Sequence, residues 1–393
     1  MIGDALVYVG DLPAATLSRE PDGVTQFAYL PDYLAGGSHP VATTLPLSSR
    51  PVIVRAGGVP PFFAGLLPEG RRLTALRRSI KASADDELAL LLAVGADLVG
   101  DVRVIPLGTA PAEAAQAIEF DGASIPLFDD LLADHGIVDK VGIAGVQDKV
   151  SARMISLPVA RANERYILKL SPPEYPHVVE NEAFFIGLAR RLRMPVVDAT
   201  VITDAAGAMA LLVRRFDRRA DGARLGVEDS CQALGLWPAD KYNVTMEGAC
   251  GALVAACSAP KVAAAALFQQ TLFAWLTGNG DVHAKNISML REESGEWRVS
   301  PAYDLPSTAL YGDLTFALSV DGEDSDLSAA HFLAMADRLA LPEPAARRTI
   351  LSLVKGTADL FQHLHGANLP FAPTQLADLK TELKRRRENL QVD

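Results

Sequence analysis

Residues 273–288 read FAWLTGNGDVHAKNIS, an apolar run that changes abruptly into a polar one. The apolar half is typical of a buried helix. Gly278, Asn279 and Gly280 are expected to end it, because these residue types stop helices and permit positive φ. A polar loop at the end of a buried helix gives reactive groups a rigid support. The loop predicted here contains Asp281, His283, Lys285, Asn286 and Ser288.

The spacing of the polar residues indicates a reaction type. Asp281 and Asn286 reproduce the Asp-x-x-x-x-Asn pattern of a kinase catalytic loop, in which the aspartate accepts a hydroxyl proton and the asparagine holds a metal ion. Residues 287–290 and 297–300 have the composition of strands, and Asp304 follows in a loop. That is the place of the aspartate in Asp-Phe-Gly, the other metal ligand. A lone loop aspartate is more often a turn former, but the combination favours a kinase-like site.

A glycine-containing segment lies upstream, before two segments that are expected to be strands. Residues 141–149 read VGIAGVQDK, and the expected strands cover residues 150–156 and 166–170. Backbone N–H groups of such a loop can approach phosphates, and an ordinary hairpin turn explains its glycines equally well. Lys169 lies in the second strand, which resembles the Val-Ala-Ile-Lys strand of kinases, whose lysine contacts nucleotide phosphates.

The helix expected over residues 177–193 carries a carboxylate on its apolar side. At about 100° per residue, Glu182 falls at the centre of an arc of apolar residues, namely Val178, Val179, Phe185, Ile186 and Ala189. An unpaired buried carboxylate is costly, so Glu182 needs a cationic partner. Two interpretations remain open: a lysine–glutamate pair with Lys169, the nearest candidate in sequence, or a structural pair with an arginine.

The rest of the chain divides into a β-rich part and a helical part. The first contains, in chain order, an antiparallel meander over residues 4–30, helices over 62–81 and 85–94, a strand over 102–106, a helix over 125–134 and strands over 197–203 and 208–213. The helical pattern then covers residues 228–236, 245–257, 261–277, 329–340, 345–364 and 374–390. This order argues for two lobes with a cleft between them.

Composition excludes several classes of protein. With 393 residues the chain is too long for one ordinary core, and its apolar runs are far shorter than the ~18 residues that span a bilayer. The net charge of −11 excludes a uniformly basic nucleic-acid surface. Cys231, Cys250 and Cys257 are odd in number and lack Cys-x-x-Cys spacing, which favours reduced thiols. We therefore expect a cytoplasmic protein that does not associate with membranes.

Two local basic clusters nevertheless stand out. Both are expected to be solvated helix faces or cationic C-terminal ends of helices, which is what such runs usually are. One consists of Arg71, Arg72, Arg77, Arg78 and Lys81, and the other of Lys380, Lys384, Arg385, Arg386 and Arg387.

Together these residues resemble the HipA family, bacterial serine/threonine-protein kinase toxins of HipBA-type toxin–antitoxin modules. The similarity covers nearly the whole chain. The segments that carry it in the site are AGVQDK at residues 144–149, ILKL at 167–170, Asn181-Glu182, RFDR at 215–218, EDSCQ at 228–232, DVHAKN at 281–286 and Tyr303-Asp304. Outside the site, FFAGLLPE at residues 62–69 and HFLA at 331–334 are also similar to family segments.

The resemblance implies an α+β, bilobal, protein-kinase-like fold. It implies a small N-terminal subdomain over residues 1–108, a β-rich N-lobe over 109–222 and a mostly α-helical C-lobe over 223–393. ATP and Mg²⁺ are the implied cofactors. The implied acceptor is a hydroxyl of a host protein, in known members an aminoacyl-tRNA synthetase, whose phosphorylation inhibits translation and growth. A helix-turn-helix antitoxin of HipB type is the implied partner, and DNA is contacted only through that complex.

The same resemblance assigns roles to individual residues. Asp281 is expected to be the catalytic base, with Asn286 and Asp304 as Mg²⁺ ligands. The phosphates are expected to contact Lys169 and a loop formed by Ala144, Gly145, Val146, Gln147, Asp148 and Lys149. The remaining residues expected at the nucleotide site are Glu182, Arg214, Arg215, Phe216, His283, Lys285 and Tyr303, with the main chain of residues 214–216 holding adenine.

One departure from the family pattern has a chemical consequence. The best-known members carry a serine three residues before the second glycine of the phosphate loop, and its autophosphorylation inactivates them. Here Gly142 occupies that place, and glycine has no hydroxyl to modify. Any autophosphorylation must occur elsewhere, with Ser151 as the candidate. Phosphopeptide mapping after incubation with ATP tests this, and an unmodified Ser151 removes the candidate.

Three other interpretations compete with a protein kinase. Asp-x-His-x-x-Asn also resembles loops of small-molecule phosphotransferases that act on aminoglycosides or choline, but those lack the Ala-Gly-x-Gln-x-Lys loop and the N-terminal unit. A catalytically idle corepressor that acts with a DNA-binding antitoxin is disfavoured, because Lys169, Asp281 and Asn286 are all present. A hydrolytic metal site of Asp281, His283 and His331 lacks a close ligand pair.

Overall fold

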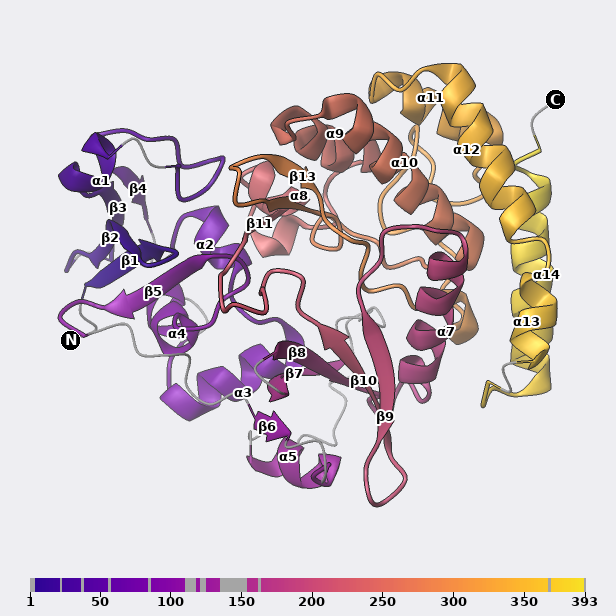
Figure 1. Cartoon of the computed structure of the whole chain (residues 1–393), viewed down its shortest axis with the longest axis horizontal. Coiled ribbons are helices and arrows are strands. Elements are labelled where there is room, and N and C mark those ends of the chain that lie inside the picture. Colours follow the sequence, from indigo (N-terminus) through magenta and orange to yellow (C-terminus); the bar gives the residue numbers. More distant parts are fainter. Residues whose placement is uncertain are drawn as a thin grey trace.

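The computed structural model describes residues 4–21, 23–36, 39–55, 58–83, 86–109, 118–120, 125–134, 154–161, 164–366 and 369–391. Figure 1 shows a β-rich part drawn from indigo to magenta and a helical part that ends in yellow. Within the described residues, the strands form sheets with the orders β4-β3-β2-β1-β5, β6-β7-β8-β10-β9 and β11-β12-β13. Residues 144–149, Gly142 and Ser151 lie outside the described residues.

The first sheet is antiparallel and buries one face in the apolar core of the N-terminal part. Its strands are β1 (Ala5–Val9), β2 (Leu12–Arg19), β3 (Thr25–Tyr29), β4 (Val52–Val54) and β5 (Val102–Pro106). The alternating residues Ala5, Val7, Leu17 and Phe27 are buried with Phe63 of a neighbouring helix in one apolar core. The meander and the final strand expected from the sequence are both present.

The helices of this part are α1 (Pro31–Ala35), α2 (Pro61–Gly65), α3 (Gly70–Ile80) and α4 (Glu87–Val94). The single helix predicted over residues 62–81 is wrong, because the chain forms α2 and α3 with a break at residues 66–69. Pro68 explains the break, since a proline disfavours the helical conformation in the residue before it. The break places Pro68 and Glu69 at the candidate site.

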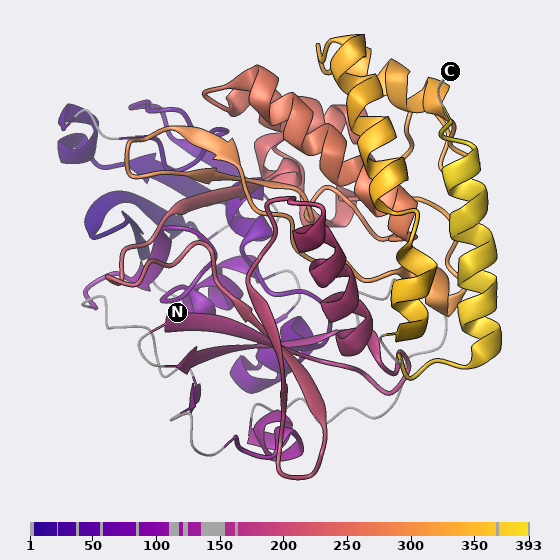
Figure 2. The same cartoon turned by 45° about the vertical axis from the view of Figure 1, so that its right-hand side comes forward.

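The second sheet supports the candidate site. It consists of β6 (Ile118–Phe120), β7 (Ile155–Arg161), β8 (Glu164–Leu170), β9 (Ala199–Thr203) and β10 (Met209–Arg214), with α5 (Phe128–Asp134) and α7 (Val178–Arg191) beside it. Figures 1 and 2 show α7 between this sheet and the helical part. The alternation of β8 buries Leu168 and Leu170 in an apolar cluster, so Lys169 points to the opposite face.

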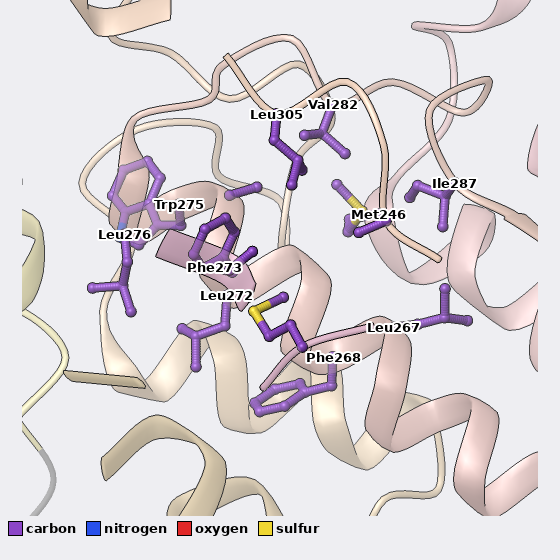
Figure 3. Close-up of a cluster of buried hydrophobic side chains, with 14 of the residues drawn as sticks. Met246, Leu267, Phe268, Leu272, Phe273, Trp275, Leu276, Val282, Ile287 and Leu305 are labelled. Atoms are coloured by element: carbon purple, nitrogen blue, oxygen red, sulfur yellow. The ribbon is translucent and has the colours of Figure 1, made fainter. Parts of the chain in front are cut away.

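The helical part is organised around one buried helix. Its helices are α9 (Met246–Ala256), α10 (Pro260–Thr277), α11 (Ala329–Arg338), α12 (Glu343–Gly356), α13 (Leu360–Gly366) and α14 (Pro373–Glu388). Figure 3 shows Phe268, Phe273 and Trp275 of α10 among the other core side chains. None of the described helices combines the length and apolarity needed to cross a membrane.

The end of α10 is fixed tightly, as the sequence predicted. Gly278 ends the helix with a φ of 71°, a conformation that glycine adopts without strain. Gly280 packs so closely that a Cβ atom there would lie 2.2 Å from the carbonyl oxygen of Thr315. The main chain of the loop is therefore held against residues 308–315, which gives its polar side chains a rigid base.

The third sheet corrects one prediction. The chain forms β11 (Gly226–Asp229), β12 (Ser288–Arg291) and β13 (Trp297–Val299), together with α8 (Ser230–Ala233), η1 (Pro238–Asp240) and η2 (Thr308–Tyr311). The helix predicted over residues 228–236 is wrong at its start, because β11 pairs with β12. Asp229 then caps α8 in a capping box with Gln232. Pairing with a strand so distant in sequence overrides the local helical pattern.

The C-terminal basic cluster is also not a fully solvated face. Arg386 is fully buried, and its guanidinium carbon lies 3.9 Å from the centroid of the Trp275 ring. It donates hydrogen bonds to the carbonyl oxygens of Trp275 and Leu314, and its Nε pairs with Glu382. Arg386 therefore fastens α14 to α10, the helix that leads into the candidate site.

Glu228 is a buried carboxyl that titrates near neutral pH. It accepts hydrogen bonds from the amide (2.8 Å) and the hydroxyl (2.6 Å) of Thr43, and burial raises its pKa from 4.5 to about 7. Because the folded-state pKa is the higher one, the stability that Glu228 contributes is present at low pH and lost as the pH rises to about 7.

We expect Glu228→Gln to remove this loss, because a neutral amide can keep both contacts to Thr43. The free energy of unfolding at pH 8 should then rise by up to about 3 kcal/mol. Urea denaturation of both proteins at pH 5 and pH 8 measures the effect. The same pH dependence in wild type and variant would contradict the assignment.

Candidate active site

The residues predicted for the kinase-like site come from four segments of the chain. These segments are the loop after α10, strand β8, helix α7 and the loop after β13. Asp281 is 2 % exposed. Its Oδ1 accepts a hydrogen bond from the Tyr242 hydroxyl at 3.2 Å, and its amide donates to Asn279 Oδ1 at 3.1 Å. Burial and the nearby Asp281 carboxylate raise the pKa of Tyr242 well above its ordinary value. Tyr242 therefore keeps its proton and presents it to Asp281.

Lys169 and Glu182 form a buried ion pair, which decides between the two partners that the sequence left open for Glu182. Lys169 Nζ lies 2.7 Å from Glu182 Oε1 and 3.0 Å from Asp304 Oδ1, and Glu182 is fully buried. Burial alone would lower the pKa of Lys169, but the carboxylates of Asp304 and Glu182 outweigh it and raise that pKa. The lysine thus remains charged and joins β8, α7 and the loop after β13.

Asp304 lies at the centre of this polar group. Its φ of 58° is in the left-handed region, which is uncommon for residues other than glycine. Asn286 Nδ2 donates to Asp304 Oδ2 at 2.7 Å, and Asn279 Nδ2 donates to the Asp304 carbonyl at 3.0 Å. The structure therefore brings the side chains of Asn286 and Asp304 into direct contact, although they lie on loops on either side of β12 and β13.

Two adjoining cavities open beside these residues. The larger has a volume of about 330 Å³, and its apolar walls include Ile167, Val213 and Phe216. The smaller has a volume of about 230 Å³ and is lined mainly by polar groups, among them Lys241, His283 and Asn286. The residues that line both are Pro68, Arg72, Lys285 and Asp304. An apolar cavity that continues into a polar one suits a ligand with a flat ring at one end and charge at the other.

The sequence of this chain matches known protein families and proteins that include kinases. The HipA-like C-terminal domain matches residues 141–361, more than half of the chain, and the HipA N-terminal domain matches residues 5–105. The chain belongs to the HipA family. The putative kinase Y4mE of Sinorhizobium fredii is 31 % identical over 371 residues, which are 87 % of each chain. The serine/threonine-protein kinase toxin HipA of Shewanella oneidensis is 30 % identical over 369 residues, 86 % of this chain and 83 % of that protein.

A solved structure of S. oneidensis HipA, in complex with HipB and its operator DNA, has the same fold. The TM-score is 0.79 at 25 % sequence identity, with 98 % of this chain and 97 % of that chain covered. This likeness confirms the predicted α+β, bilobal, HipA-like fold.

Other residues predicted for the HipA-family site also lie at the cavities. His283 lines the polar cavity, and its ring lies edge-on to Tyr242 with 5.0 Å between the ring centroids. Tyr303 and Phe216 line the apolar cavity with their ring centroids 5.9 Å apart. The Tyr303 hydroxyl donates to the carbonyl of Lys285 at 2.7 Å, so the predicted site residues also hold one another in place.

Three predicted residues have side chains that are occupied elsewhere. Lys285 Nζ bonds to Asp229 and to the Gly65 carbonyl, each at 2.8 Å. Arg215 belongs to a buried ion cluster with Asp97 and Asp217, and Arg214 pairs with Glu164 at 2.6 Å. All three residues line the apolar cavity, but their charged ends fasten neighbouring segments together.

The structure adds site residues that the sequence did not single out. Tyr242 contacts Asp281, and Lys241 Nζ pairs with Glu69 at 2.5 Å at the polar cavity. Neither residue lies in a catalytic pattern. Glu69 belongs to the family segment at residues 62–69, whose place in the site is not visible from its distance in sequence.

The structure does not support the alternative of a hydrolytic metal site. Across the described residues, no group of three or more His, Cys, Asp or Glu side chains is placed to hold a metal ion. His331, one of the proposed ligands, instead accepts a hydrogen bond from the Ser328 amide at the start of α11, at 3.0 Å.

Proposed function

We propose that this HipA-family chain is a cytoplasmic, ATP-dependent serine/threonine protein kinase that acts as the toxin of a type II toxin–antitoxin system. One observation carries the proposal. Asn286, Asp304 and the Lys169–Glu182 pair, predicted from separate sequence patterns, meet beside one pair of adjoining cavities. Asp281 lines neither cavity, but its partner Tyr242 packs against His283, which lines the polar one. These are the parts that a kinase needs to position ATP and a hydroxyl acceptor.

The apolar cavity is the proposed place of adenine. Ile167, Val213 and Phe216 give it apolar walls, with Tyr303 beside Phe216. The main chain of Phe216 makes no hydrogen bond within the described part of the chain, so its N–H and C=O remain available to the edge of a base. The phosphates then extend toward Lys169 and the polar cavity. The loop at residues 144–149 remains a predicted further phosphate contact.

Asn286 and Asp304 fit a magnesium ion. Mg²⁺ prefers oxygen ligands and is usually bound by one or two side chains together with phosphates and waters. Asp304 offers carboxylate oxygens, and Asn286 can offer its amide oxygen once the amide group turns from its present contact with Asp304. Bound there, the ion would neutralise charge on the β- and γ-phosphate oxygens.

Asp281 is the proposed base. The acceptor hydroxyl donates its proton to the carboxylate as the oxygen attacks the γ-phosphorus, and ADP leaves. Asp281 Oδ1 already accepts a hydrogen bond from the Tyr242 hydroxyl at 3.2 Å, which is the kind of contact that the acceptor hydroxyl would have to make. Most of the acceleration in such a site comes from positioning and charge stabilisation.

We further propose an aminoacyl-tRNA synthetase as the acceptor and a helix-turn-helix antitoxin of HipB type as the partner, with DNA contacted through that complex. The S. oneidensis complex of HipA, HipB and operator DNA supports the antitoxin proposal. The second candidate function is that of a small-molecule phosphotransferase. The third is that of a corepressor without catalytic activity. The intact Lys169–Glu182 pair disfavours the third.

Phosphoproteomics after induced expression tests the proposed function. Wild type should raise phosphoserine or phosphothreonine on one or a few host proteins, and Asp281→Ala should not. Equal phosphoproteomes from the two strains would contradict a protein acceptor.

A further inference from the structure

Arg72 is a cation at the site that the sequence marked only as part of a basic cluster. It lies in the first turn of α3, is only partly exposed, and lines both cavities. No hydrogen bond or ion pair joins its guanidinium to any residue that the structure describes. The expectation that the first basic cluster is a solvated helix face is therefore wrong for this residue.

The other lysines and arginines at the two cavities differ from Arg72, because they are paired with carboxylates. Among the described residues, each other lysine or arginine that lines a cavity has a carboxylate partner. The pairs are Lys169–Glu182, Lys241–Glu69, Lys285–Asp229, Arg71–Glu174, Arg214–Glu164 and Arg215–Asp217. These cations are neutralised within the protein, whereas Arg72 is left to interact with a ligand.

Keeping an unpaired cation at this position is unfavourable for several reasons. Burial and the guanidinium of Arg215 lower the pKa of Arg72. Asp97 attracts it, but that carboxylate already bridges Arg215 and Arg218. The first turn of a helix is also where the helix dipole repels a cation. A residue that costs stability in the empty protein but borders the site indicates a role in binding.

We propose that Arg72 binds the terminal phosphates of the nucleotide, so that α3 of the N-terminal part completes the ATP site. This inference rests on the proposed function. Arg72 is among the residues shared by the two cavities, together with Asp304, which is where phosphates would extend from adenine toward Asn286. A guanidinium presents a planar fork of N–H donors that fits phosphate oxygens.

Equilibrium binding to the full-length protein tests the inference. Isothermal titration calorimetry would compare Mg·ATP and adenosine on wild type, Arg72→Gln and Arg78→Gln. Arg78 is the matched control, because it lies on the same helix, is exposed and lines neither cavity. Arg72→Gln should weaken ATP at least about tenfold, the usual effect of a charge-assisted hydrogen bond. It should leave adenosine affinity unchanged, and Arg78→Gln should change neither.

Thermal denaturation without ligand separates a binding role from a structural one. Removing an unpaired cation should leave the melting temperature of Arg72→Gln equal to that of wild type or higher, and ATP should raise it less than it raises wild type. Unchanged ATP affinity in Arg72→Gln overturns the inference while the proposed function stands. A lower melting temperature with equal losses of ATP and adenosine binding overturns it in favour of a structural role. If wild type binds no ATP, the proposed function fails as well.

Discussion

Asp281→Asn is expected to lower the rate of phosphoryl transfer by a factor of about 10²–10⁴, the usual contribution of a positioned general base. The side-chain amide of asparagine has nearly the same shape as the aspartate carboxylate, and its oxygen can still accept a hydrogen bond from Tyr242. It cannot take the proton of an acceptor hydroxyl. ATP affinity should stay within about twofold of wild type, because the proposed nucleotide contacts do not include Asp281. Single-turnover transfer from radiolabelled ATP and calorimetric ATP binding measure the two quantities.

Asp324→Asn provides the matched control for this prediction. Asp324 is an exposed carboxylate of the same helical part and should leave both quantities unchanged. Full transfer activity in Asp281→Asn would show that another group accepts the proton. Loss of ATP binding together with activity would show that Asp281 acts on the nucleotide instead.

Asp217→Ala is expected to lower the free energy of unfolding by about 3–5 kcal/mol, because it leaves buried arginines without their shared carboxylate. Asp217 Oδ2 accepts bonds from Arg215, Arg218 and the Gly100 amide, each at 2.8 Å. Burial by itself would raise the pKa of Asp217, but Arg215 and Arg218 outweigh it and hold the pKa well below its ordinary value. The stability that Asp217 contributes is therefore present above its unfolded-state pKa and is lost only in acid.

This cluster joins the N-terminal part to the strand that borders the apolar cavity, so its loss should also weaken ATP binding. Asp221→Ala is the control, since Asp221 lies in an exposed turn of the same segment and should change stability little. Urea denaturation at neutral pH compares the three proteins. A stability of Asp217→Ala equal to that of wild type would mean that the cluster does not hold the two parts together.

The candidate site residues that the sequence predicted are those marked by short-range patterns. The glycines after α10 ended the helix where expected, because they satisfy a local conformational need. For Glu182 the sequence left two partners open, Lys169 or an arginine, and the structure shows Lys169. The apolar arc around Glu182 required a cation, and the period-2 alternation of β8 placed Lys169 opposite its apolar neighbours.

What the sequence did not reveal depends on contacts between distant segments. β11 is a strand because it pairs with β12, so its helical pattern misled. Lys285 lies in the catalytic pattern, yet its amine is bound by Asp229 and Gly65, from two other segments. Arg72 looked like part of a solvated face, because nothing in its own helix shows that α3 borders the cavities. Such roles follow from tertiary packing, which local patterns do not encode.

We propose that this chain transfers phosphate from ATP to a protein hydroxyl. The most direct measurement incubates purified wild type with γ-labelled ATP, Mg²⁺ and a cell lysate, followed by phosphoamino-acid analysis of the protein fraction. We predict phosphoserine or phosphothreonine label above that of the lysate alone, and a rate of this labelling at least about 10²-fold lower with Asp281→Asn. Label found only in small molecules, or equal labelling of proteins by Asp281→Asn, would contradict the claim.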